Sequence, residues 1–297
     1  MNDNRRPFAA TFSIEATRPG AAEIAAIAGT LPRGTAVYLS AVPSVGPAEL
    51  VTTAAAVRKA GLEPVAHIAA RRLVDAGQLQ DLLKALRSEA DMRQFLVIGG
   101  DVDRSGPFAD ALAVIQKGAL RELGFTDIGI AAYPEGHAHI APGRLEAALD
   151  EKIASCAAQG LHAHIVSQFS FSPERVLTWL RQLRASGIAV PVKIGMAGPT
   201  SVPALLRYAK RCGVAASLRG LVSGVGAGLV GQITTGSVGP GRMIEALAAT
   251  HEQSDDLGDI APHYFSFGGV VETAYYACDA ARGTHSKSRA MARPNSA

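Results

Sequence analysis

The chain has few cysteines, and it has no long apolar run. Its 3 cysteines, Cys156, Cys212 and Cys278, are odd in number and far apart, which argues against a disulfide framework and against a CxxC metal or redox site. No segment supplies the roughly 18 consecutive apolar residues that span a bilayer, and the N-terminus lacks an apolar run of signal-peptide length. We therefore expect a cytoplasmic protein that does not enter a membrane.

Charged residues are also scarce, at 19% of the 297 residues, and the net charge is only +3. Much of the positive excess follows Cys278, but this stretch has no interleaved aromatic residues, so we expect a flexible basic tail over 284–297 and no nucleic-acid partner. What the chain has in abundance is apolar residues, at 48%, which indicates a large core and excludes disorder for most of its length.

Strand-like apolar runs alternate with helix-like patterns along most of the chain. The expected strands are Phe8–Glu15, Thr35–Ser40, Glu63–Ile68, Phe95–Ile98, Ile128–Ala132, His162–Val166, Val190–Ile194 and His263–Phe267. The expected helices are Ala21–Gly29, Pro47–Ala60, Ala76–Arg87, Pro107–Leu123, Gly143–Gln159, Pro173–Ser186 and Val270–Ala281. Between 201 and 252, where glycines interrupt the pattern, we expect two further helices.

Such alternation is typical of an eight-stranded parallel barrel or of a doubly wound open sheet. The strand expected at His263–Phe267 supplies an eighth strand, and the length fits the roughly 250 residues of a typical barrel. We predict a single-domain α/β fold, a (β/α)8 TIM-type barrel, over residues 1–283.

Polar residues follow most of the expected strands. The clearest case is the fifth, where Ile128–Ala132 runs directly into Tyr133, Glu135 and His137. The residues at the other strand ends are Glu15, Ser40, His67, Asp101, Gln168, Gly195 and Met196. Because parallel strands end at the same rim of a barrel, these residues predict a concave site lined from many strands.

Six short motifs at these strand ends resemble those of the methylenetetrahydrofolate reductases. They are FSIE at Phe12–Glu15, AH at Ala66–His67, GD at Gly100–Asp101, AAYPEGH at Ala131–His137, SQFSF at Ser167–Phe171 and HYFSF at His263–Phe267. The similarity runs from about Phe12 to Cys278. Members of that family are barrel flavoenzymes that use FAD to reduce the methylene group carried by tetrahydrofolate.

The resemblance implies a role for each matching position. Glu15 is expected to be the general acid that opens the five-membered ring of the folate, and Asp101 the carboxylate that tunes hydride transfer. Both should contact the folate substrate, together with Gln168. The implied FAD-binding positions are Ser40, His67, Gly100, Asp101, Ala132, Tyr133, His137 and Lys152.

The resemblance also implies NADH or NADPH as a candidate electron donor, and we expect a homo-oligomer. The chemistry of Glu15 is compatible with the implied role, because burial in an apolar barrel mouth disfavours an ionised carboxylate and so keeps a proton available near neutral pH. The flavin would carry the redox step, and the protein would position and polarise the substrate.

The chain departs from the family at several positions. Gly99 stands where the family has the Arg before Gly-Asp, Ser172 replaces an acidic residue, and Gly268 and Gly269 replace an Asn-Arg pair. These departures predict that the protein uses a less usual electron donor or folate form. One such reaction is the oxidation of 5-methyltetrahydrofolate to the methylene level.

Two other patterns suggest different functions. GAGLVG at 226–231 matches a dinucleotide-binding fingerprint, but no convincing strand precedes it and no helix follows it. HAHI occurs at His137–Ile140 and at His162–Ile165, and paired histidines can bind zinc, but the two pairs are expected at opposite mouths of the barrel, so we expect no metal. The alternatives are a metal-dependent barrel hydrolase and a folate-binding barrel without redox chemistry.

Overall fold

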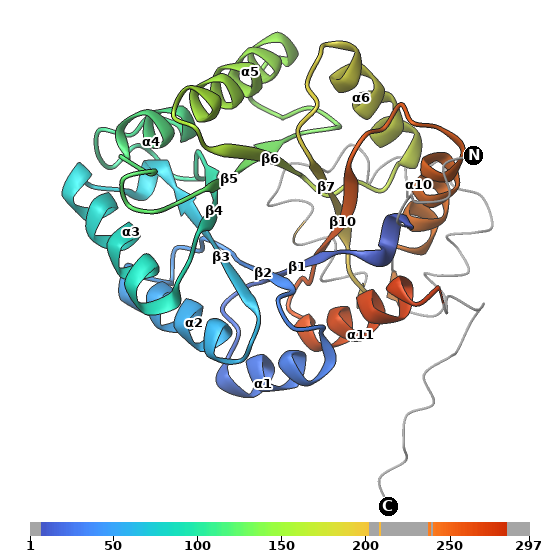
Figure 1. Ribbon diagram of the computed structural model, residues 1–297, viewed down its shortest axis with the longest axis horizontal. Helices are drawn as coiled ribbons and strands as arrows, with labels where there is room; N and C mark the ends of the chain where they lie inside the picture. Colours follow the sequence, from blue (N-terminus) through green and yellow to red (C-terminus); the bar gives the residue numbers. More distant parts are fainter. Residues whose placement is uncertain (1–6, 202–207, 209–236, 239, 284–297) are drawn as a thin grey trace, which may run out of the picture.

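The computed structural model describes residues 7–201, 208, 237, 238 and 240–283, and their main feature is a closed barrel of parallel strands (Figure 1). Its strands are β1 (Ser13–Ala16), β2 (Ala36–Leu39), β3 (Glu63–Ala69), β4 (Gln94–Ile98), β5 (Asp127–Ala132), β6 (His162–Ser167), β7 (Val192–Ala197) and β10 (Ile260–Phe265). They pair in the order β1-β10-β7-β6-β5-β4-β3-β2, and β2 pairs again with β1. The predicted (β/α)8 barrel is therefore confirmed, and the open sheet is excluded.

Helices surround the barrel in Figure 1. They are α1 (Ala21–Thr30), α2 (Pro47–Lys59), α3 (Ala76–Ala90), α4 (Ala111–Lys117), α5 (Pro142–Ala158), α6 (Pro173–Ala185), α10 (Gly241–Gln253) and α11 (Val270–Ala281). Short 3-10 helices, η1 (Phe8–Ala10) and η2 (Ala70–Arg72), precede β1 and follow β3. None of the described helices is long and apolar enough to cross a membrane.

Local sequence signals fix where several helices start. Proline is at the start of α2, α5 and α6, where the missing N–H removes no helical hydrogen bond. Asp75, Asp110 and Ser172 cap α3, α4 and α6 by accepting a hydrogen bond from a backbone N–H of the first turn. These caps fix the residue at which each helix begins. They therefore also fix where the loop that follows the preceding strand ends.

Alternate residues of each strand face either the helices or the barrel interior. The outward residues join one continuous core with the helices, for example Ile128 and Ile130 of β5 and Ile194 and Met196 of β7. Tyr38, Val65, Leu96 and Val166 form a separate small cluster. Because its members come from β2, β3, β4 and β6, they meet inside the barrel.

The interior contains polar side chains where barrels ordinarily have branched apolar ones. The hydroxyl of Tyr38 on β2 lies 2.9 Å from Nε2 of His164 on β6, so this hydrogen bond crosses the barrel. Gly129 gives it room, because a Cβ there would lie 3.0 Å from the same nitrogen. The ammonium of Lys193 lies 5.8 Å from the centre of the Tyr38 ring, within cation–π range.

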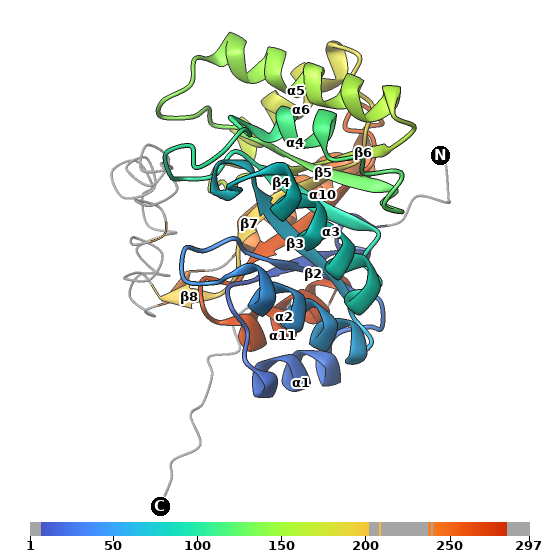
Figure 2. The ribbon, with the colours of Figure 1, turned by 90° about the vertical axis from the view of Figure 1, so that its left-hand side faces the viewer.

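The carboxyl ends of the strands meet at one rim, which is on the left in Figure 2. A small antiparallel sheet of β8 (Thr200–Ser201) and β9 (Ser237–Val238) lies beyond this rim. This sheet was not predicted from the sequence. The GAGLVG pattern at 226–231, Cys212 and the expected tail at 284–297 lie outside the described residues.

The element boundaries differ from expectation mainly at two places. Residues 8–10, expected as the start of the first strand, form η1, and β1 begins only at Ser13. The fourth helix, expected over Pro107–Leu123, is confined to Ala111–Lys117, since Asp110 caps its start and Gly118 ends it. One of the two helices expected between 201 and 252 is α10, which extends to Gln253.

The buried His164 should make stability depend on pH. Burial lowers the pKa of His164 from 6.5 to about 3, helped by the charge of Lys193 and by His263. The unfolded chain therefore binds a proton that the folded chain excludes, and the contribution of His164 is present above pH 6.5 and lost as the pH falls toward 3. We expect His164→Gln to reduce the slope of unfolding free energy against pH in this window by up to about 1.4 kcal/mol per pH unit.

Denaturant unfolding between pH 4.5 and 7.5 measures this slope. The matched control is His162→Gln, which changes the exposed histidine at the start of the same strand. Equal slopes for the wild type and His164→Gln would contradict the expectation.

Candidate active site at the carboxyl rim of the barrel

Glu15 lies at the end of β1 with its carboxylate between three side chains. Ser40, just after β2, donates a 2.6 Å hydrogen bond to Oε1 of Glu15. Nε2 of His67 on β3 lies 3.6 Å from Oε2, and Nε2 of His263 on β10 lies 3.5 Å from the same oxygen. The Glu15 side chain is only 12% exposed, so these neighbours, and not water, provide most of its polar environment.

His263 is oriented from its other side by Ser13. Oγ of Ser13 lies 2.9 Å from Nδ1 of His263, and the histidine side chain is fully buried. A neutral imidazole has one donor and one acceptor nitrogen. The geometry fits a tautomer in which Nδ1 accepts from Ser13 and Nε2 donates to Glu15. The Tyr38 ring packs edge-on against His263, with centroids 4.6 Å apart, on the side of the cluster that faces the barrel interior.

The pKa of Glu15 is lowered, which corrects the expectation that burial alone would keep it protonated. Burial does raise the pKa, but the charge of His67, the hydrogen bond and charge of His263 and the hydrogen bond from Ser40 outweigh it. Burial in turn lowers the pKa of both histidines against the opposing influence of Glu15. In the protein without ligand, the environment of Glu15 therefore favours the ionised carboxylate.

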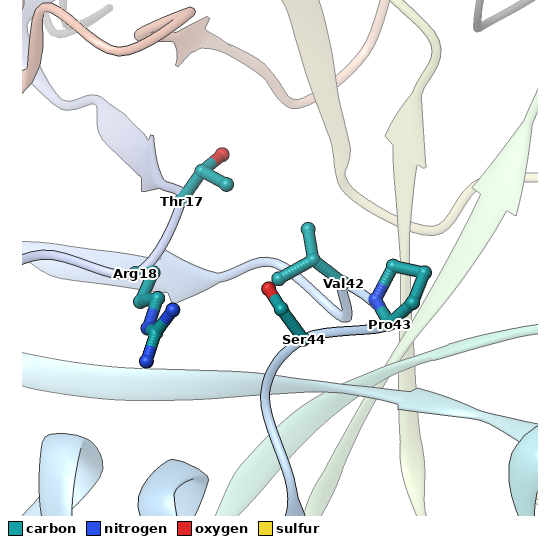
Figure 3. Close-up of a pocket in the computed structure, with 5 residues that line it drawn as sticks. All are labelled: Thr17, Arg18, Val42, Pro43 and Ser44. Carbon is teal, nitrogen blue, oxygen red and sulfur yellow. The ribbon is translucent and has the colours of Figure 1, made fainter.

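A cavity of about 480 Å³ opens next to this cluster. Figure 3 shows its lining, with Thr17 and Arg18 directly after β1 and Val42, Pro43 and Ser44 on the loop after β2. The hydroxyl of Thr17 lies 3.1 Å from that of Ser40, so the cavity wall is one hydrogen bond away from the side chain that contacts Glu15. A small molecule bound there would contact the loops that follow β1 and β2.

The residues expected after β4 lie elsewhere on the rim. Asp101 is more than half exposed and forms a 2.5 Å ion pair with Arg72 of η2, not a contact with Glu15. Asp101 follows β4, which is three strands away from β1 in the barrel order. Gly100 adopts a φ of +95°, a conformation that favours glycine, and so turns the chain between β4 and Asp101.

The motif after β5 forms an aromatic wall. The rings of Tyr133 and His137 meet edge-on with centroids 5.0 Å apart, and His137 is half-buried in a tight loop that returns to Ile140. Ala132 is buried, and its carbonyl accepts a 2.8 Å hydrogen bond from the backbone N–H of Gln168. This bond links the ends of β5 and β6.

Two expected site residues have mainly structural contacts. The amide oxygen of Gln168 accepts from the N–H of Phe169 at 3.0 Å. Glu135, noted at the end of β5, accepts a short hydrogen bond from the hydroxyl of Ser170.

At the end of β7, Met196 faces the helices, and a Cβ on Gly195 would lie 2.3 Å from the carbonyl of Ser167, so neither offers a side chain to the rim.

Lys152 is on α5, on the outer layer of the barrel. Burial lowers the pKa of its ammonium, and the charge of Asp110, the cap of α4, opposes that shift. The charge of Asp110 thus reaches Lys152 from the start of α4.

Sequence reasoning did not assign a role to three side chains of the Glu15 cluster. His263 belongs to a recognised motif, but the motif does not reveal which of its residues face inward. Ser13 and Tyr38 lie in strands with apolar residues on both faces. The pairing of Ser13 with His263 and of Glu15 with Tyr38 would have revealed the cluster, but it depends on barrel register, which the sequence does not show.

Several polar atoms near the rim are buried without a hydrogen-bond partner among the described residues. They are Nε2 of His67, Nε of Arg72 and Oε2 of Glu135. Buried polar groups normally have partners, so these atoms suit a bound polar ligand. Within the described part of the chain, no group of three or more histidine, cysteine or acidic side chains is arranged to hold a metal ion.

These features define a single-domain (β/α)8 barrel with an acid–histidine cluster at its carboxyl mouth. The family model of methylenetetrahydrofolate reductase matches residues 28–217, more than half of the 297-residue chain. The chain belongs to the methylenetetrahydrofolate reductase family, and so to the folate-related barrel oxidoreductases of one-carbon metabolism. Glu15 and His263 lie outside the matched range, so their roles depend on the geometry.

Solved structures resemble the chain in fold. Dihydropteroate synthase from Thermus thermophilus in complex with 6HMPPP has a TM-score of 0.50 and 14% identity, covering 96% of both chains. Another structure of that synthase, from the same organism, has a TM-score of 0.49 and 15% identity, covering 93% of both chains. At such identities the likeness concerns the barrel alone.

Removing the Ser40 hydroxyl should raise the pKa of Glu15. The 2.6 Å hydrogen bond from Ser40 favours the ionised carboxylate, so Ser40→Ala removes one of the influences that lower the pKa. Infrared titration of the carboxyl band in a protein labelled with 13C-glutamate measures the effect. Ser44→Ala, on the loop that lines the same cavity, is the control and should leave the titration unchanged. An unchanged or lower pKa in Ser40→Ala would contradict the assignment.

Proposed function

We propose that this protein is an FAD-dependent oxidoreductase that interconverts 5,10-methylenetetrahydrofolate and 5-methyltetrahydrofolate. The observation that carries the proposal is the buried Glu15, held by Ser40, His67 and His263 beside a rim cavity, in a chain of this family. The reaction needs one proton as well as a hydride, and Glu15 is an ionisable group placed to exchange that proton. NADH or NADPH is the candidate electron donor.

Glu15 acts as the proton donor when the ring of the folate opens and as the acceptor when it closes. Because its pKa is lowered, Glu15 in the ligand-free protein is the ionised carboxylate, which can accept a proton. Protonation is favoured when a bound ligand excludes water or draws the histidines away from the carboxylate, because either change removes support for the negative charge. His263, fixed by Ser13, keeps the carboxylate in place for both directions.

The rim residues fit a flavin dinucleotide in chemical terms. His67 presents a buried nitrogen without a hydrogen-bond partner, and Tyr133 and His137 present aromatic surface. Gly100 allows close approach of the backbone. FAD, when bound, would supply the hydride-carrying ring, and His67, Gly100, Tyr133 and His137 are the residues proposed to hold it, with Ser40, Asp101, Ala132 and Lys152 as further family positions. The folate is proposed to contact Glu15, Asp101 and Gln168.

The purified protein should be yellow and contain non-covalent FAD. We expect the double change of His137→Ala and Lys152→Ala to lower flavin occupancy, and the paired control, His162→Ala with Lys117→Ala at exposed positions, to leave it unaltered. Absorbance at the flavin bands after denaturation measures occupancy. A colourless protein with stoichiometric zinc would indicate the metal-dependent hydrolase, and a colourless, metal-free folate binder would indicate a barrel without redox chemistry.

Glu15→Gln should separate the two half-reactions. The variant nearly conserves shape but removes the proton, so oxidation of the reduced enzyme by methylenetetrahydrofolate should slow by roughly 10²–10⁴-fold, the usual contribution of general acid catalysis. Reduction of the flavin by its donor should change little. Stopped-flow absorbance follows each half separately. Equal slowing of both would show that Glu15 is needed for structure and not for proton transfer.

A further inference from the structure

Arg71 is held at three points between the ends of β3 and β4. Its backbone N–H donates to the carbonyl of Gly99 at 3.0 Å, and its carbonyl accepts from the N–H of Ser105 at 2.9 Å. Its side chain donates from Nε to the carbonyl of Ala109 at 3.1 Å. The guanidinium therefore has a defined place at the rim.

That place is directly over Gly99. A Cβ built on Gly99 would lie 3.5 Å from Nη2 of Arg71 and 4.0 Å from Cζ. Gly99 is also the position at which the family sequence has an arginine. The chain thus lacks a guanidinium on residue 99 but presents one from residue 71 over the same backbone position.

The charge of Arg71 is available to a ligand. Its neighbour Arg72 is paired with Asp101, and Asp110 caps α4, whereas the side-chain hydrogen bond of Arg71 goes to a carbonyl and not to a carboxylate. His137, part of the aromatic wall, lies within its electrostatic reach, because the pKa of His137 is lowered by burial, by His139 and by Arg71. A guanidinium with unused N–H groups suits the paired oxygens of a phosphate.

We propose that Arg71 binds the diphosphate of FAD at the rim, and so supplies from η2 the cation that is absent from residue 99. This inference rests on the proposed function, since it names a contact of the same cofactor. The aromatic wall of Tyr133 and His137 lies on the β5 side of this guanidinium. Arg71 and this aromatic wall thus flank the two glycines that follow β4.

The test compares FAD with riboflavin, which has the same ring but no phosphate. Arg71→Ala should weaken FAD binding by about ten- to a hundred-fold, as loss of charge-assisted hydrogen bonds does, and should leave riboflavin binding unchanged. Arg71→Lys keeps the charge but not the paired donors, and should give an intermediate affinity. Arg104→Ala, which removes an exposed cation from the loop after β4, is the control for general electrostatics and should bind FAD as the wild type does.

The decisive variant combines Arg71→Ala with Gly99→Arg. Gly99 does not have the left-handed backbone that would exclude a side chain, so an arginine there can reach the vacated space, and FAD affinity should recover while riboflavin affinity stays constant. If Arg71→Ala weakened FAD binding and riboflavin binding equally, or did not weaken FAD binding, the proposed role of Arg71 would be overturned and the proposed function would stand. Absence of flavin binding in the wild type would overturn the proposed function and this inference with it.

Discussion

The burial of the Glu15 carboxylate is the constraint on which the site depends. An ionised carboxylate loses much of its hydration at the mouth of a barrel, and proteins tolerate that loss only when donors and opposite charges replace the water. Here the polar neighbours come from the strands on either side of β1 and from β3. Ser40 after β2 and His263 on β10 are within hydrogen-bond distance of Glu15, and the imidazole of His67 on β3 lies slightly farther away, at 3.6 Å. The site can therefore form only when the barrel closes and brings β10 against β1.

The polar side chains in the barrel interior next to the site must also find hydrogen-bond partners in place of water. Tyr38 packs its ring on His263 and directs its hydroxyl to His164 across the barrel. Its phenol stays neutral, because burial and the nearby charge of Glu15 both raise its pKa. A neutral phenol and a neutral imidazole can fill a polar interior without adding a second charge below the carboxylate. The interior is thus polar but carries little charge beyond Glu15 and Lys193, whose pKa burial lowers.

The sequence predicts the fold well because strand and helix patterns alternate and because prolines and capping residues mark the helix starts. It predicts the neighbours of Glu15 less well. Ser40 and His67 were identified because polar residues at strand ends stand out, whereas Ser13 and Tyr38 lie within strands whose two faces are both buried. The partner of Asp101 was missed for another reason: Arg72 lies in a 3-10 helix after β3, a place that periodicity does not resolve.

The departures from the family pattern also have local structural consequences. Ser172 caps α6 and donates to Glu174, so the loss of an acidic residue there is accompanied by a helix cap. Gly268 adopts a φ of +91°, which glycine accommodates without strain, and Gly269 precedes α11. The positive φ of Gly268 is thus a local reason for glycine at that position.

The charge state of Glu15 bears on the proton transfer of the proposed reaction. Closing the five-membered ring of the folate releases a proton, and opening it consumes one. Because Ser40, His67 and His263 together lower the pKa of Glu15, the protein without ligand presents the form that accepts a proton. Ring opening requires that Glu15 first be protonated, which costs free energy against those same neighbours, whereas ring closure uses the resting form. Because a catalyst lowers the same barrier in both directions, this cost should appear in the pH dependence of the proposed reaction and does not set its direction.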